Sequence, residues 1–255
     1  MQSKVYFSSL LQINPKYRAA AGRLFNTLSA CDVKYEFIQN TKDIWVRDFM
    51  PIKTNSGKYI SFRYEPSYLK KHPKLRTDYK HDIAKQFPWP IIYSNINLDG
   101  GNVVFSPSKE KVIISDRVFS ENNGLDVKEL EHLLEARVII IPSFDDDMTG
   151  HADGMVRFID ENTVLVNEGD GEVLREKGFD VVEFPYFDSA GMSAVGCYLN
   201  FLETAKHIFL PVFGVKSDDK VIEQTNQIFR KEIVPVNINE IAKDGGLLNC
   251  ISWEM

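Results

Sequence analysis

The chain has 255 residues, of which 44% are hydrophobic and 26% charged, and its formal net charge is −6. This composition is typical of a globular protein, and the acidic balance argues against nucleic acid or a membrane surface as the main partner. The three cysteines, Cys31, Cys197 and Cys250, form no close pair, so neither a disulfide framework nor a zinc site is indicated. Residues 1–12 do not resemble a signal peptide, and no apolar run is long enough to span a bilayer. We therefore expect a cytoplasmic protein.

A helix followed by a short extended run recurs five times along the chain. Apolar periodicity and helix-start residues predict helices at 15–31, 77–87, 126–135, 171–178 and 218–231. The apolar runs that follow predict strands at 35–38, 91–93, 138–141, 181–184 and 233–236. A second extended run then carries polar residues, usually with a hairpin partner, most clearly at 155–159 and 163–166.

Acid, histidine and cysteine residues recur at nearly equal intervals in these units. Asp48, Asp99, His151 and Cys250 are separated by 51, 52 and 99 residues, and the last interval is close to two periods. Equal spacing indicates equivalent positions in successive units of a repeat. We therefore expect one active site at the centre of a ring of modules.

The ring needs a way to close, because the fifth unit runs out of chain after Cys250. A strand at 5–8 can supply the missing element, which would bury the apolar face of the last unit and remove exposed sheet edges. The sequence thus predicts a single α/β domain that covers residues 1–255.

A thiol, an imidazole and several carboxylates together favour one kind of chemistry. A cysteine thiolate is the strongest side-chain nucleophile, and a nearby histidine acts as general acid and base. Carboxylates would destabilise the anionic intermediate of acyl transfer, but they suit a planar cation with several N–H donors. The set therefore indicates attack by sulfur on the central carbon of a guanidinium or amidinium group, with a cationic small molecule as the partner.

Local spacing predicts how these side chains are presented. His151 and Asp153 would share one face of a strand and point into one cavity. Asp48 and Arg47, as neighbours on a strand, would face opposite sides, which leaves Asp48 for the site and Arg47 for the structure. Asp99 precedes two glycines, so a role in a turn is its alternative.

Five motifs follow one another over most of the chain: Trp-x-Arg-Asp at 45–48, Asp-Gly-Gly-Asn at 99–102, Gly-His-x-Asp at 150–153, Tyr-Leu-Asn-Phe at 198–201 and Gly-Gly-x-x-x-Cys at 245–250. In this order they resemble agmatine deiminase and the Porphyromonas-type peptidylarginine deiminases. Each motif alone is weak, but five in order are specific. The resemblance implies the pentein fold, a five-bladed α/β propeller with pseudo-five-fold repeats, and a guanidine-modifying activity.

The resemblance also implies a role for each chemical group. Cys250 would be the nucleophile that forms a covalent amidino-thioether. His151, oriented by Asp99, would protonate the leaving ammonia and then activate water. Asp48 and Asp153 would hold the guanidinium nitrogens bidentately. No metal or organic cofactor is implied.

Three positions depart from the pattern of the family that the chain resembles. Met50 stands where glycine is usual, and Asn249 stands where histidine is usual. Asp99 is one methylene shorter than the usual glutamate, so we expect its contact with His151 to be longer or bridged by water. The core chemistry should survive these changes, whereas the substrate is left open.

Trp45 and Asn200 are further candidates for contact with the substrate. The alternative for each is a purely structural role. An agmatine-like compound is the first substrate hypothesis. The alternatives are a peptidylarginine deiminase, an amidinotransferase, a dimethylarginine hydrolase and a non-catalytic binding module of the same fold. A homo-oligomeric state also stays open.

Overall fold

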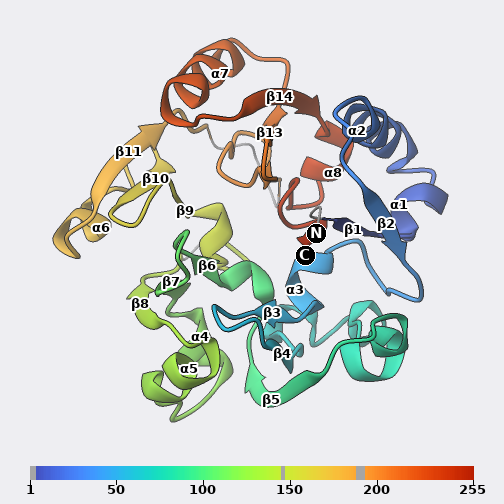
Figure 1. Cartoon of the computed structure of the whole chain (residues 1–255), viewed down its shortest axis with the longest axis vertical. Helices are drawn as coiled ribbons and strands as arrows, with labels where there is room; N and C mark the ends of the chain where they lie inside the picture. The colour runs from blue at the N-terminus through green and yellow to red at the C-terminus, as the bar shows by residue number, and fades with distance from the viewer. Residues whose placement is uncertain (1–3, 145–146, 188–192) are drawn as a thin grey trace.

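The computed structural model of the protein describes residues 4–144, 147–187 and 193–255. Its strands form five three-stranded sheets that surround a central axis like the blades of a propeller (Figure 1). In each sheet the middle strand pairs antiparallel with one neighbour, here named the inner strand, and parallel with the other, here named the outer strand. The predicted ring of five sheet units is confirmed.

The five sheets share one order of strands. The inner strands are β3 (Ile52–Lys53), β6 (Val104–Phe105), β9 (Val156–Phe158), β12 (Leu202–Glu203) and β15 (Ser252–Glu254). The middle strands are β4 (Tyr59–Arg63), β7 (Lys111–Ser115), β10 (Thr163–Asn167), β13 (His207–Val212) and β1 (Val5–Ser8). The outer strands are β5 (Ile91–Asn97), β8 (Arg137–Ile141), β11 (Asp180–Phe184), β14 (Glu232–Asn237) and β2 (Tyr35–Ile38). Figure 1 shows β3, β6 and β9 toward the axis and β5, β8 and β11 toward the rim.

Helical crossovers join each middle strand to its parallel outer strand, as parallel pairing requires. Among the described residues these crossovers are α1 (Leu10–Ile13) with α2 (Arg18–Ala30), α4 (Arg117–Glu121) with α5 (Val127–Leu134), α6 (Glu172–Glu176) and α7 (Ser217–Ile228). In the sheet β3–β4–β5, here named the second blade, the crossover consists of short turns, η1 (Ser67–Leu69), η2 (Pro73–Leu75), η3 (Tyr79–Ile83) and η4 (Ala84–Gln86). The helix predicted at 77–87 is therefore a π-helical turn followed by a 3₁₀ turn, and the other four predicted helices are confirmed with shorter bounds.

Helix α5 illustrates how the sequence sets these elements. The Asp126 carboxylate accepts a hydrogen bond from the Lys128 N–H and caps the first turn. Leu130 and Leu134, four residues apart, are buried on one face. Glu135 then adopts a left-handed conformation, which ends the helix.

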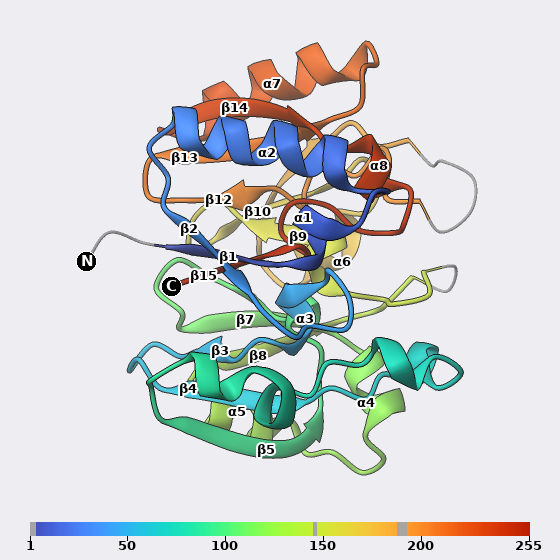
Figure 2. The same cartoon turned by 90° about the vertical axis from the view of Figure 1, so that its right-hand side faces the viewer.

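The N-terminal strand closes the ring, as the sequence predicts. β1 pairs antiparallel with β15, with Tyr6 opposite Trp253 and Phe7 opposite Ser252. The N-terminal and C-terminal strands thus belong to one sheet, and Figure 2 shows β1 and β15 side by side. Closure buries Phe7 completely and holds Ser252–Glu254, which follow Cys250 closely, in a sheet as β15.

The polar motifs lie outside the strands, and here the sequence-based expectation was wrong. Asp48 lies in the short helix α3 (Val46–Phe49), and Asp153 lies in the 3₁₀ helix η6 (Ala152–Gly154) that directly follows His151. Asp99 directly precedes a second 3₁₀ helix, η5 (Gly100–Asn102). Each turn ends a few residues before an inner strand, so the strand fixes where the turn lies and the turn aims the side chain.

Candidate active site

A ring of hydrogen bonds links the five motif segments to one another. The Gly101 N–H donates to Asp48 Oδ1 at 3.1 Å, and the Ala152 N–H donates to Asn102 Oδ1 at 3.2 Å. These bonds join the first motif to the second and the second to the third.

The remaining bonds complete the ring. The Asn200 amide donates to the Asp153 carbonyl at 3.4 Å, and the Cys250 N–H donates to Asn200 Oδ1 at 3.1 Å. The Arg47 N–H then donates to the Cys250 carbonyl at 3.1 Å. The motifs that recur along the sequence therefore meet around the axis, where the sequence predicts the site.

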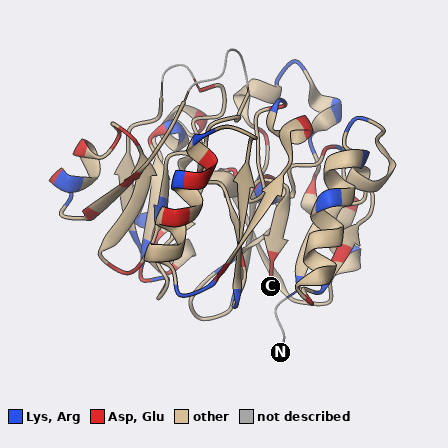
Figure 3. Cartoon of the chain, turned by 90° about the horizontal axis from the view of Figure 1, so that it is seen from above, with Lys and Arg blue, Asp and Glu red and all other residues tan. Residues whose placement is uncertain are grey.

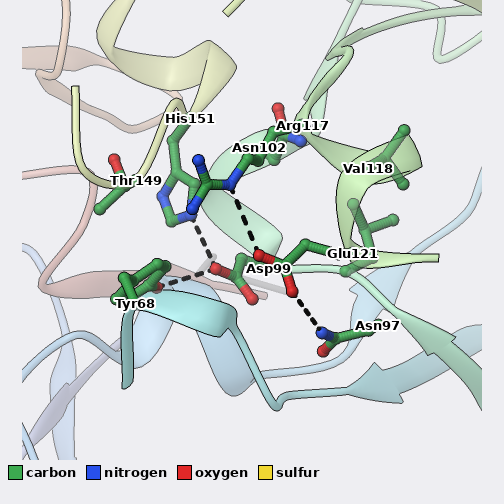
Figure 4. Close-up of a pocket in the computed structure, with 10 residues that line it drawn as sticks. Tyr68, Asn97, Asp99, Asn102, Arg117, Val118, Glu121, Thr149 and His151 are labelled. Atoms are coloured by element: carbon green, nitrogen blue, oxygen red, sulfur yellow. Dashed lines mark hydrogen bonds and ion pairs between the residues drawn. The ribbon is translucent and has the colours of Figure 1, made fainter. Parts of the chain in front are cut away.

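His151 lies between two carboxylates. Its Nε2 is 2.8 Å from Asp99 Oδ2, and its Nδ1 is 3.5 Å from Asp48 Oδ1. The contact with Asp99 is direct, so the expectation of a longer or water-bridged contact was wrong. Asp99 Oδ2 also accepts a 2.8 Å hydrogen bond from the Tyr68 hydroxyl, which the sequence did not predict (Figure 4).

Two glycines allow this close approach. A Cβ on Gly100 would collide with the Arg47 carbonyl oxygen. A Cβ on Gly101 would lie 2.6 Å from His151 Nδ1 and 2.7 Å from Asp48 Oδ1. Neither position has room for a side chain, so the glycines let the second motif pack against the first.

Cys250 faces the same group of acids. Its Sγ lies 3.2 Å from Asn200 Oδ1 and 3.6 Å from Asp153 Oδ2. Asn200 thus holds both the backbone N–H and the thiol of Cys250. The side chain of Cys250 is partly accessible, whereas Cys197 is buried.

Asn249 is, after Tyr68, a second residue whose contact with the site was not predicted from the sequence. Its amide donates to Asp153 Oδ2 at 2.7 Å, and its Oδ1 accepts from Arg157 at 3.1 Å. The sequence marked Asn249 only as a departure from the family pattern. Its contact orients the Asp153 carboxylate beside the thiol.

Arg47 and Trp45 support the C-terminal segment. Arg47 forms a 2.6 Å ion pair with Glu254, and its Nε donates to the Asn249 carbonyl at 3.2 Å. The Trp45 ring packs where a Cβ of Gly246 would lie. The structural role expected of Arg47 agrees with these contacts.

Burial and mutual repulsion shift the pKa values in this cluster. Burial raises the pKa of Asp48 to about 8, and the charges of Asp99 and Asp153 add to this effect while His151 opposes it. Burial alone lowers the pKa of His151, but the carboxylates of Asp48, Asp99 and Asp153 outweigh burial and raise that pKa to about 10. Burial, followed by Asp153 and Asp48, raises the pKa of the Cys250 thiol well above its ordinary value. The site therefore carries an excess of negative charge and a protonated thiol.

The carboxylates keep oxygen atoms for a ligand. Within the described part of the chain, Asp48 Oδ2 and Asp153 Oδ1 accept no hydrogen bond, and no lysine or arginine forms an ion pair with Asp48, Asp99 or Asp153. No group of three or more acidic, histidine or cysteine side chains in the described ranges has the geometry of a metal site. None of the described helices is long and apolar enough to cross a membrane. The free oxygens of Asp48 and Asp153 suit a planar organic cation with several N–H donors.

The raised pKa of His151 predicts how stability depends on pH. The folded protein holds the His151 proton up to about pH 10, whereas an ordinary histidine loses it near pH 6.5. The His151 proton therefore adds its full contribution to the free energy of unfolding below pH 6.5. This contribution is lost as the pH rises through about 10, by at most about 1.4 kcal/mol per pH unit. Chemical unfolding at several pH values from 6.5 to 9.5 should show a steeper loss for the wild type than for His151→Gln.

The matched control is His132→Gln, because His132 is exposed on α5 and lies outside the cluster. This variant should keep the slope of the wild type. Equal slopes for the wild type and His151→Gln would contradict the charged imidazole.

Solved structures share this fold across the whole chain. The agmatine deiminase of C. jejuni superimposes with a TM-score of 0.77 at 18% identity, covering 99% of this chain and 93% of that one. DDAH from Pseudomonas aeruginosa, in complex with citrulline, gives a TM-score of 0.69 at 12% identity, with 100% of both chains covered. At these identities the likeness concerns the fold, and it establishes the predicted five-bladed pentein architecture.

A family model matches a larger share of this chain than the curated relatives do. The "Putative agmatine deiminase" of Lactococcus lactis is 34% identical over 76 residues, which are 29% of this chain and 21% of that relative. The match thus spans about a fifth of the relative's length. The family model described as Porphyromonas-type peptidyl-arginine deiminase matches residues 9–176 and 172–255. These matches cover nearly the whole chain, which therefore belongs to the Porphyromonas-type peptidyl-arginine deiminase family.

Proposed function

We propose that the protein is a deiminase, which hydrolyses a guanidino substrate to a ureido product and ammonia through a covalent intermediate on Cys250. The observation that carries this proposal is a half-buried thiol and a buried imidazole among three carboxylates with which no described lysine or arginine forms an ion pair. Membership of the family supports the same class of reaction.

The substrate cation would supply the positive charge that pairs with these carboxylates. Asp48 and Asp153 each offer an oxygen that accepts no other hydrogen bond in the described residues, so each can take an N–H of the guanidinium. Charge-assisted bonds to a planar cation are short and directional. They fix the central carbon of the guanidinium beside the thiol, which Asn200 holds in place.

Bond making and breaking follow from this placement. The Cys250 thiolate attacks the guanidinium carbon, and His151 donates a proton to one –NH₂ group, which leaves as ammonia. The neutral His151 then takes a proton from water, whose oxygen bonds to the same carbon. As the C–S bond breaks and returns the thiolate, the new hydroxyl group gives up its remaining proton to the solvent, and the carbon leaves as a ureido group.

Substrate binding also supplies the activated nucleophile. In the free site, burial and the charges of Asp153 and Asp48 raise the pKa of the Cys250 thiol. A bound cation offsets the same charges, so it lowers that pKa and favours the thiolate only when substrate is present. This coupling protects the thiol from reaction in the empty site.

The surroundings favour a guanidino compound without a carboxylate, such as agmatine. The three arginines that neighbour the site are already engaged, Arg47 with Glu254, Arg157 with Asn249 and Glu203, and Arg117 with Glu121. A substrate carboxylate would therefore find no unpaired arginine there and would be repelled by the acids. Agmatine-like amines are therefore better candidate substrates than arginine.

The first test is ammonia release from a panel of guanidino compounds. Agmatine should release ammonia and yield an equal amount of ureido product, arginine should do so at least about tenfold more slowly, and Cys250→Ala should abolish both because the nucleophile is lost. The panel should also contain methylated arginines and an arginyl peptide, which test the alternative activities of the family. Full turnover by Cys250→Ala would overturn the proposal.

The second test concerns the grip on the cation. Asp153→Asn removes the charge behind one hydrogen bond to the substrate, worth about 1.5–3 kcal/mol, so kcat/KM should fall by a factor of about 10 to 100. The matched control is Glu36→Gln, because Glu36 lies on β2 and pairs only with Lys4 among the described residues. If Asp153→Asn kept the kcat/KM of the control, the carboxylate would not bind the substrate.

A further inference from the structure

Tyr68 approaches the candidate site from a part of the chain that carries none of the five motifs. It lies in η1 (Ser67–Leu69), in the crossover of the second blade. Its hydroxyl donates to Asp99 Oδ2 at 2.8 Å, the same oxygen that lies 2.8 Å from His151 Nε2. Figure 4 shows the phenol and the imidazole reaching this carboxylate from different segments.

Contacts with helix α4 and with His151 fix the position of Tyr68. The Ser67 N–H donates to both carboxylate oxygens of Glu121 on α4, each at 3.1 Å. Arg117, one turn earlier on α4, donates to Ser67 Oγ at 3.1 Å. The phenol ring also packs edge-on against the His151 ring, with centroids 6.1 Å apart. The hydroxyl is therefore held toward Asp99.

We propose that Tyr68 is a positioning residue for the reaction, which acts through Asp99 on the proton of His151. This inference rests on the proposed deiminase function. Tyr68 and His151 share one oxygen of a short carboxylate, so the hydroxyl restricts Asp99 to the orientation that faces the imidazole. The hydroxyl also takes part of the carboxylate's charge, which keeps the imidazole proton transferable.

The protonation states agree with a donor role for the phenol. Burial, and then the charge of Asp99, raise the pKa of Tyr68 well above its ordinary value, so Tyr68 remains a hydroxyl. Asp99 is buried and has Tyr68 and His151 as its side-chain hydrogen-bond partners within the described ranges. A donor placed there weakens the pull of Asp99 on the imidazolium.

Other charged groups face the same pair and must stay unchanged in the test. His151 also faces the carboxylates of Asp48 and Asp153. Asp43 and the phenol of Tyr64 lie within electrostatic reach of Asp99. Tyr68→Phe keeps all four groups and the aromatic ring, and removes only the hydroxyl.

The experiment is an NMR titration of the His151 imidazole in the full-length protein without substrate. In Tyr68→Phe the pKa of His151 should rise by about half a unit or more, because Asp99 then has His151 as its remaining donor. In the Asp99→Asn background, Tyr68→Phe should leave the His151 pKa unchanged, since the hydroxyl acts through that carboxylate. Tyr93→Phe, on the exposed Tyr93 of β5, is the control and should match the wild type.

Kinetics supply an independent readout. With agmatine as substrate, Tyr68→Phe should lower kcat about tenfold and leave KM within about threefold, because the carboxylates that bind the cation are untouched. An unchanged or lowered His151 pKa in Tyr68→Phe, or a kcat equal to that of Tyr93→Phe, would overturn the proposal. The titration needs no turnover, so it tests Tyr68 even if ammonia release overturns the proposed function.

Discussion

Three buried carboxylates surround one imidazole, and no lysine or arginine side chain in the described part of the molecule forms an ion pair with them. Burying charge without full compensation costs free energy, so such a cluster weakens the fold that contains it. The pKa of Asp48, which burial raises to about 8, is a sign of this cost, and the raised pKa of His151 shows that its protonated ring offsets part of it. A cationic substrate relieves it, which is why the proposed chemistry and the electrostatics of the empty site point to the same ligand class.

The fold makes this cluster by repetition and closure. Each inner strand is preceded by a turn that carries one motif, and hydrogen bonds join every motif to the next around the axis. The pairing of β1 with β15 fixes the last unit, so that Cys250 meets Asp153 although 97 residues separate them. No single blade contains enough of these groups to act alone. The site exists only in the closed ring.

The repeat explains how much the sequence could predict. A period of about fifty residues identified the five units, the closing strand and the residues that meet at the axis, because equivalent positions of a ring face one centre. The backbone of the motifs was not predictable in the same way. His151 and Asp153 are two residues apart, which fits a strand, but the chain forms a 3₁₀ turn directly after His151 and strand β9 begins only at Val156.

Contacts that do not repeat escaped prediction. Tyr68 reaches Asp99 from a crossover whose short turns carry no periodic signal, and only its tether to α4 brings it there. The distance between Asp99 and His151 was misjudged because side-chain length alone does not set it. Gly100 and Gly101 let their segment pack close to the first motif and His151, which makes a direct contact reachable for the shorter acid.

The most direct measurement of the central claim is the mass of the protein quenched in acid during turnover of agmatine. Our account predicts a covalent adduct on Cys250 whose mass is that of agmatine less ammonia, and its absence from Cys250→Ala. An adduct on another residue, or steady turnover of agmatine by Cys250→Ala, would contradict the account.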